Sequence, residues 1–348
     1  MRARRAYVPA LIVLAVAAGA SAGEARRPPV TVRVMTRNLY LGANLDAIVR
    51  AKSLGEALSA VANAWTQVQA NDFPTRARAI AGEIARVKPD FVGFQEAVLY
   101  RTQTPPDLTA TPATHVALDY VAELRRALAA RHLGYRFVGV GAWTDAELSA
   151  GNPATMDIRL TVRDALLARV EGGLRIRRVR KVQYAATTPL FGGFITAKRG
   201  YVSADATLRG RTFRVINTHL ESFSDASQVA QGQELATAAR ATRLPTILLG
   251  DFNSRADGST TPTYANLLAA GFHDAWAEAH PGEPGLTCCH GEDLRDLGGP
   301  FYSRIDYVLL RNGFRATAAG IVGQEPADRI GALWPSDHAG LWARLSLR

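Results

Sequence analysis

The chain has 348 residues, a length that suits one domain of roughly 250–320 residues. Apolar residues make up 47% of it and can supply a sizeable core, and the absence of an internal repeat excludes solenoids and propellers. The net charge is +10, and it is 10 − 3 = +7 without residues 1–22, which carry three arginines and no acid; this positive charge would attract nucleic acid or anionic lipid. Basic residues within 175–181 alternate with apolar ones, however, which is also the pattern of a solvated strand face.

Residues 1–22 carry the pattern of a secretory signal peptide. Three arginines precede an apolar stretch at 8–18 and an Ala-Ser-Ala cleavage site at 20–22. The stretch is too short and too rich in alanine to favour a stable membrane span, although an uncleaved anchor is the alternative. We therefore predict a secreted or periplasmic protein with a signal peptide at 1–22, a linker at 23–30 and one domain at 31–348.

Apolar periodicity and turn residues predict a mixture of strands and helices. Pro74 lies in the first turn of one helix, and Pro89 ends it. Gly172-Gly173 and Arg209-Gly210 each lie between two strand-like runs and indicate hairpins. In chain order we expect a strand at 32–35, a helix at 73–88, a strand at 90–96, a helix at 116–131, a strand at 137–140, a loop at 144–158, hairpins at 165–170/174–179 and 201–208/213–217, a helix at 227–242, and strands at 247–249, 306–310 and 340–347.

Asp251 and Asn253 follow the apolar run that ends at Gly250. Residues two apart on an extended chain point to the same side, so this carboxylate and this amide can face a single atom. Hydrolysis needs such a pair, because the carboxylate takes a proton from water and the amide orients the water or the substrate. Asp and Asn are also ordinary turn formers, which is the structural alternative.

Other predicted strands also begin or end with polar side chains. Asn38 ends the first strand, Glu96 and His219 end later ones, and Asp306 opens another. Each has an ordinary explanation as a cap, a turn residue or a satisfied core histidine. Together they predict one site, because binding and catalytic groups gather at strand ends in layered α/β folds.

Six polar clusters follow one another along the chain: Asn38, Gln95-Glu96, Asn217-Thr218-His219, Gly250-Asp251-Phe252-Asn253, Arg304-Ile305-Asp306-Tyr307 and Ser336-Asp337-His338. In this order they resemble the endonuclease/exonuclease/phosphatase superfamily. The resemblance implies an α+β fold, a four-layer α/β sandwich in which two packed mixed β-sheets are flanked by helices. It also implies divalent-metal-dependent hydrolysis of phosphate esters.

The resemblance also assigns the expected metal ligands. Glu96 is implied as the principal ligand, with Asn38 beside it and Asp337 as a second carboxylate on the metal side. Hard oxygen donors favour Mg²⁺, with Mn²⁺ or Ca²⁺ as substitutes. Cys288, Cys289 and His290 lack the spaced pairs of a structural zinc motif, and the two cysteines are expected to be a free or mutually bonded structural pair.

The catalytic roles implied by the resemblance fall on five residues. Asp251 polarises the attacking water and Asn253 orients it, while Asp306 holds the His338 that contacts the phosphate. His219 lies near the leaving oxygen as a general acid. Whether Asp251 or His338 is the base stays open at this point, and the two are treated as a coupled unit.

The substrate stays open between nucleic acid and a phospholipid head group. His219 within Asn-Thr-His-Leu resembles secreted deoxyribonucleases and sphingomyelinases, whereas Tyr40 stands where abasic-site endonucleases carry an acid. Arg159 or Arg163 is a candidate phosphate contact, unless this segment is only a charged surface strand. The alternatives are a phosphomonoesterase acting on a sugar or inositol phosphate and a non-catalytic binding protein of the same fold. No protein partner is evident.

Overall fold

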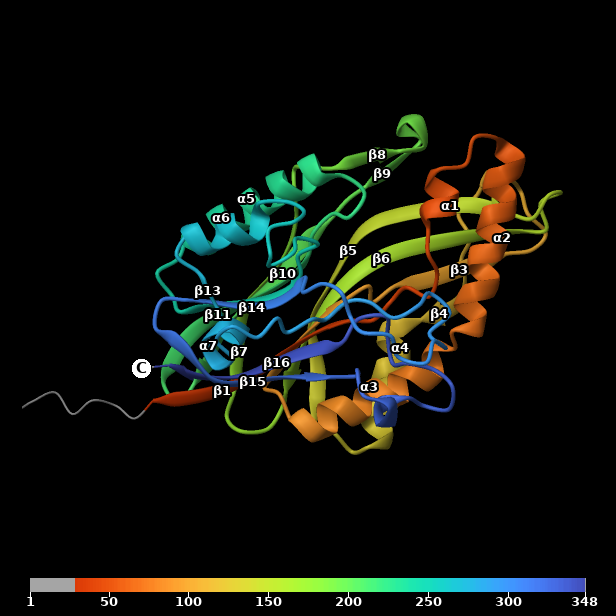
Figure 1. The fold of residues 1–348 in the computed structure, drawn as a ribbon. Coiled ribbons are helices and arrows are strands. Elements are labelled where there is room, and N and C mark those ends of the chain that lie inside the picture. The colour runs from red at the N-terminus through yellow and green to blue at the C-terminus, as the bar shows by residue number, and fades with distance from the viewer. Residues whose placement is uncertain (1–28, 348) are drawn as a thin grey trace, which may run out of the picture.

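Two β-sheets pack face to face, and helices cover both outer faces (Figure 1). The computed structural model describes residues 29–347. The predicted signal peptide at 1–22 and most of the predicted linker lie outside the described residues. Within 29–347, no helix has the length and apolar character needed to cross a bilayer.

The first sheet has eight strands in the order β15-β16-β1-β2-β6-β3-β4, with β5 also paired to β6. β1 and β2 are parallel, and β16 pairs with β1 in the opposite direction. The carboxyl ends of β1 and β2 therefore lie at the same edge. The strands are β1 (Val30–Asn38), β2 (Phe91–Gln95), β3 (Leu99–Gln103), β4 (His115–Asp119), β5 (Tyr135–Ala150), β6 (Met156–Arg169), β15 (Phe314–Val322) and β16 (Gly340–Leu347).

The second sheet has six strands in the order β13-β14-β12-β11-β10-β7. β11 and β12 are parallel, and β14 runs antiparallel to β12. The strands are β7 (Arg175–Gln183), β10 (Gly200–Leu208), β11 (Arg211–His219), β12 (Thr246–Asp251), β13 (His273–Asp274) and β14 (Asp306–Arg311), and a separate small hairpin is formed by β8 (Thr188–Leu190) and β9 (Ile195–Ala197).

Apolar residues of both sheets meet in one core between them. Val34 and Leu166 of the first sheet belong to the same buried cluster as Val215 and Leu249 of the second. α2, α3 and α4 cover the outer face of the first sheet, and α5 and α6 cover that of the second (Figure 1). The predicted four-layer α+β sandwich is confirmed. The helices are α1 (Asp46–Val49), α2 (Leu54–Ala70), α3 (Phe73–Val87), α4 (Tyr120–Ala130), α5 (Asp225–Arg240), α6 (Thr263–Ala269) and α7 (Ala275–Ala279).

A polar contact fixes the two sheets to each other beside the site. Asn217 of β11 donates to the backbone oxygen of Phe94 at 2.9 Å and accepts from Gln95 Nε2 at 2.6 Å. Gly93 makes this approach feasible, because a Cβ at that position would lie 2.2 Å from Asn217 Oδ1. The ends of β2 and β11 are thus held at a fixed separation.

Several predicted elements match the structure closely. The hairpin formed by 201–208 and 213–217 is the β10-β11 pair, and the helix predicted at 73–88 is α3. The helix predicted at 227–242 begins two residues earlier, because Ser224 accepts a hydrogen bond from the Ser227 N–H and caps α5.

Three predicted elements are wrong in extent or pairing. Residues 115–119 form β4, and the following helix begins only where Asp119 caps it. The predicted loop at 144–158 is mostly strand, because β5 and β6 pair along nearly their whole length. Gly172 and Gly173, at φ 87° and 78°, lead the chain from one sheet to the other, since β6 pairs with β2, β3 and β5 whereas β7 pairs with β10.

Candidate active site

Four strand ends bring the predicted site residues to one edge of the sandwich. In the first sheet Asn38 lies beside Gln95, each at the last position of its parallel strand. In the second sheet His219 lies beside Asp251 at the ends of parallel β11 and β12, and Asp251 lies opposite Asp306 at the start of β14. Strand register therefore places His219, Asp251 and Asp306 next to one another in the second sheet, and Asn38 beside Gln95 in the first.

Asn38 connects acids that come from different sheets. Its Nδ2 lies 3.0 Å from Asp251 Oδ2 and 3.5 Å from Glu96 Oε1. Glu96 directly follows β2 with a left-handed φ of 56°, and its Oε2 accepts the Leu41 N–H at 2.5 Å. The Tyr40 N–H donates to Asn38 Oδ1 at 2.9 Å. The loop after β1 therefore orients both the amide and the carboxylate.

Asp306 fixes the orientation of His338. His338 Nδ1 lies 2.8 Å from Asp306 Oδ2, so Nδ1–H donates to this carboxylate. The other ring nitrogen, Nε2, faces Asp251 Oδ2 at 3.9 Å. Ser336, two residues earlier, donates to the backbone oxygen of Asn38 at 2.8 Å and ties this loop to the end of β1.

His219 lies on the other side of Asp251. Its Nε2 is 3.6 Å from Asp251 Oδ2, and its Nδ1 is 3.0 Å from Arg199 Nη1. Asn253 donates its backbone N–H to Asp251 Oδ1 at 3.0 Å and its side-chain amide to the Leu220 oxygen at 2.9 Å. Asn253 thus orients the Asp251 carboxylate through the backbone.

Burial and crowding of charge shift the pKa values of these groups. Burial, with added repulsion from Asp306, raises the pKa of Asp251 to about 7. Burial and Asp337 also raise the pKa of Glu96. A divalent cation would relieve this crowding, because it favours the charged form of every nearby carboxylate.

The two histidines are shifted in opposite directions. Burial lowers the pKa of His219 well below its ordinary value, and the Arg199 guanidinium adds to the effect. Burial would also lower the pKa of His338, but Asp306 and Asp337 outweigh it and raise that pKa well above the ordinary value. His338 is therefore the cationic imidazole of the site, while a neutral His219 is a weak proton donor for the predicted general-acid role.

The residues present fit a divalent metal ion. The carboxylate oxygens of Asp251 and Asp306 lie within 4.8 Å of each other and of the His338 ring, so two acidic oxygen donors are concentrated at this point. The side chain of Asp306 is fully buried, yet its Oδ1 has no hydrogen-bond partner within the described chain. Carboxylate and amide oxygens are the donors that Mg²⁺ and Mn²⁺ prefer. The predicted ligands Asn38 and Glu96 adjoin this group through the Asn38–Asp251 hydrogen bond.

Two candidate phosphate contacts have other partners. Arg159 pairs with Asp145, and Arg163 donates to the Ala97 and Val98 oxygens and pairs with Asp119. This segment is therefore better described as a charged strand, whose arginines pair with groups of the protein, than as a phosphate-binding segment.

Arg199, which contacts His219, was not among the predicted site residues. The signal for it was the Lys198-Arg199 pair directly before β10. Cys288 and Cys289 are bonded to each other, and Cys288 forms an isolated backbone bridge with His338. Bonded sulfurs do not supply the thiolates that bind a metal, so this pair acts as part of the scaffold.

The chain belongs to the endonuclease/exonuclease/phosphatase family, whose sequence model matches residues 60–338. The matched segment contains seven of the eight predicted site residues, and Asn38 precedes it. Members of this family are usually hydrolases that act on phosphate esters, and they typically depend on a divalent metal. Among curated proteins, none matches the sequence at a significant level.

Solved structures of the same family share the fold. A family protein from Bacteroides thetaiotaomicron is 17% identical, with a TM-score of 0.62 over 92% of this chain and 100% of that one. A mannosyl-6-phosphatase from the same organism is 17% identical, with a TM-score of 0.56 over 90% and 99%. TDP2 from D. rerio, complexed with a single-strand DNA product, is 17% identical, with a TM-score of 0.54 over 90% and 98%.

Proposed function

We propose that this protein is an exported, divalent-metal-dependent phosphodiesterase that hydrolyses phosphate esters by in-line attack of water. The observation that carries the proposal is the convergence of Asn38 and Glu96 from one sheet with Asp251, Asp306 and His338 around one small volume. Support for export comes only from the sequence pattern of residues 1–22.

In the proposed reaction the oxygen of water bonds to phosphorus and the ester P–O bond opposite it breaks. Asp251 accepts the proton that water loses, and the leaving oxygen takes up a proton from solvent. His338, held by Asp306, donates from Nε2 to a non-bridging phosphate oxygen, where negative charge accumulates. A metal ion held by Glu96, Asn38 and Asp337 would supply further positive charge to that phosphate.

Phosphodiesters of nucleic acid or of phospholipids are the proposed substrates. A phosphomonoesterase is the second candidate, because the structural neighbours include a mannosyl-6-phosphatase as well as a protein bound to a DNA product. The fold alone does not separate these chemistries.

A substrate panel with and without metal tests the proposal. The purified protein is incubated with plasmid DNA, sphingomyelin, phosphatidylcholine, bis-p-nitrophenyl phosphate and p-nitrophenyl phosphate, in EDTA and then with added Mg²⁺. We expect turnover of at least one diester, loss of that turnover in EDTA and its return with Mg²⁺. Undiminished hydrolysis in chelator would overturn the metal's role, and turnover of the monoester alone would establish the second candidate.

A further inference from the structure

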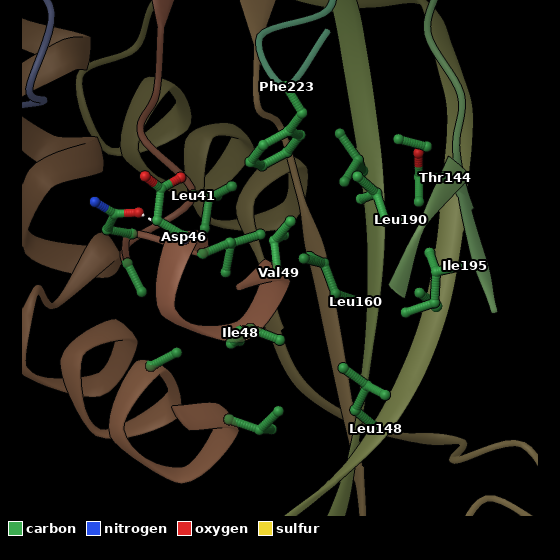
Figure 2. A pocket seen from close by; sticks show the side chains of 18 of the residues that line it. Leu41, Asp46, Ile48, Val49, Thr144, Leu148, Leu160, Leu190, Ile195 and Phe223 are labelled. Carbon is green, nitrogen blue, oxygen red and sulfur yellow. Dashed lines mark hydrogen bonds between the residues drawn. The ribbon is translucent and has the colours of Figure 1, made fainter. Parts of the chain in front are cut away.

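A cavity of about 300 Å³ adjoins the candidate active site. It lies between the α1-α2 segment on one side and the β5-β6 ribbon with the β8-β9 hairpin on the other. Figure 2 shows Val49 of α1 together with Leu160 of β6 and Ile195 of β9 around this space. Elements distant in the sequence therefore build its walls together.

The cavity is apolar along its walls and polar at one end. Leu41, Leu148 and Leu160 are among the aliphatic residues that line it. Glu96 and Asp337, both predicted metal ligands, line the same cavity. A phosphate group bound at the candidate site would therefore place one of its ester substituents at the entrance to an apolar space.

The charges in the cavity select against a second phosphate. Its described lining has three carboxylates, Asp46, Glu96 and Asp337, and a single cationic side chain, Arg199. A nucleic-acid strand carries one charge per phosphate and needs basic residues along its path. An uncharged hydrocarbon substituent meets no such penalty and gains from leaving water.

The geometry points to an amphiphilic phosphate ester as the substrate, with one aliphatic chain in this cavity and its phosphate at the candidate active site. This inference rests on the proposed function and narrows it. The volume is at the lower end of the roughly 300–1,000 Å³ range of small-molecule sites, so it suits a single chain. Phe194, at the tip of the β8-β9 hairpin, is 88% exposed and does not line the cavity.

A series of alkyl 4-nitrophenyl phosphates tests the inference. The methyl, butyl, octyl and dodecyl diesters are compared with Mg²⁺, below the concentrations at which they form micelles. We expect kcat/KM to rise by about threefold to fourfold for each methylene that enters the cavity, and then to level off when it is full. Equal kcat/KM for the methyl and octyl esters would overturn the inference, while turnover of the methyl ester would still support the proposed function.

Two neighbouring residues of the hairpin supply a matched pair of variants. Ile195→Ser places a hydroxyl in the cavity wall, and Phe194→Ser changes a side chain that points to solvent. The ratio of octyl to methyl kcat/KM should fall at least tenfold in the first variant and stay at the wild-type value in the second. Ala64→Phe, which fills the cavity from α2, should also lower this ratio. It replaces Ile195→Ser in the test if that variant does not fold. Equal ratios in all folded variants would contradict the assignment.

Binding measurements separate the cavity from catalysis. If no ester is turned over, the proposed function fails, and calorimetry with octyl phosphate and methyl phosphate in Mg²⁺ tests the cavity alone. Octyl phosphate should bind at least tenfold more tightly, and equal affinities would overturn the inference. Hydrolysis of long-chain phospholipid in vesicles would identify membrane lipids as the substrate. Hydrolysis of the octyl ester, with no hydrolysis of the vesicle lipid, would identify a soluble amphiphile as the substrate.

Discussion

At the scale of single residues, Asp251 and His338 are the most direct test of the chemistry. Each is in position to act on the attacking water or the phosphate, so Asp251→Ala and His338→Ala should each lower kcat by about 10³-fold or more. The double variant should lose little beyond the worse single variant, because the two act as a unit.

Folding must be shown to survive these substitutions. The raised pKa of Asp251 indicates that its charge is disfavoured in the metal-free fold, which offsets part of the cost of losing its hydrogen bonds from Asn38 and Asn253, so Tm should change little. Asp257→Ala, on an exposed turn, is the control for loss of a carboxylate and should keep full activity. A folded Asp251→Ala protein with near-normal kcat would remove Asp251 from the mechanism.

The ionisation of Asp164 provides a separate test, through the pH dependence of the free energy of unfolding. It is fully buried on β6, where Trp143 Nε1 donates to Oδ2 at 2.7 Å, and burial raises its pKa to about 7. In the unfolded chain its pKa is about 3.9. The folded state therefore holds this proton more tightly, so the resulting stability is complete below about pH 4 and is lost as the pH rises to about 7.

Asp164→Asn keeps an acceptor for Trp143 and cannot ionise. In metal-free buffer its free energy of unfolding, relative to the wild type, should therefore increase between pH 4 and pH 8 by an amount on the order of 1–4 kcal/mol. Urea unfolding at several pH values measures this difference. A difference that is independent of pH would mean that Asp164 stays ionised in the fold.

Most of the candidate site could be predicted at this scale, because its residues stand at recognisable strand ends. Asp251 and Asn253 follow an apolar run that is a strand, and Asp306 opens β14 as expected. Arg199 could not be assigned in the same way, because its role depends on which strand end lies beside it. That neighbour is His219, and the two residues come together only because β10 pairs with β11.

At the scale of elements, α3 supports the site through one buried side chain. Arg76 has no exposed surface, and it donates to the backbone oxygens of Leu39, Tyr40 and Pro335 at 2.6, 3.0 and 3.0 Å. These oxygens belong to the loop after β1 and the loop before Ser336. Arg76 therefore holds two loops together. One contains Leu41, whose N–H binds Glu96, and the other leads into Asp337 and His338.

Arg76→Met should lower the free energy of unfolding by about 3 kcal/mol or more, because several buried oxygens lose their donor. It should also weaken activation by Mg²⁺. Arg78→Met, two residues along the same helix and exposed, is the matched control and should change stability by less than about 0.5 kcal/mol. Equal urea midpoints for the two variants would show that Arg76 does not anchor these loops.

The elements missed from the sequence explain why the cavity was not foreseen. α1, α2 and the β8-β9 hairpin were not predicted, and all three line it. The long β5-β6 pair was mistaken in part for a loop, because polar residues such as Asp145 interrupt the apolar pattern there, as Arg159 does just beyond it. Those two side chains pair with each other across the strands, which local sequence does not reveal.

At the scale of the whole molecule, the site exists only when the two sheets are packed together. Asn38 and Glu96 belong to the first sheet, and Asp251 and Asp306 belong to the second. A cation held by Glu96, Asn38 and Asp337 beside this junction would bind the folded state and not the unfolded chain, and would therefore stabilise the fold by mass action. The layered fold was predictable from the order of strand-end motifs, whereas the exact partners across the two sheets required the packed structure.

The location of bound metal is the most direct test of this account. Crystals grown with Mn²⁺ and measured near the manganese absorption edge should show an anomalous density peak beside the carboxylates of Glu96 and Asp337. The same experiment on Glu96→Ala crystals should show a much weaker peak. Manganese bound only elsewhere in the protein, or no peak at a saturating concentration, would contradict the proposal that these strand ends form a metal centre.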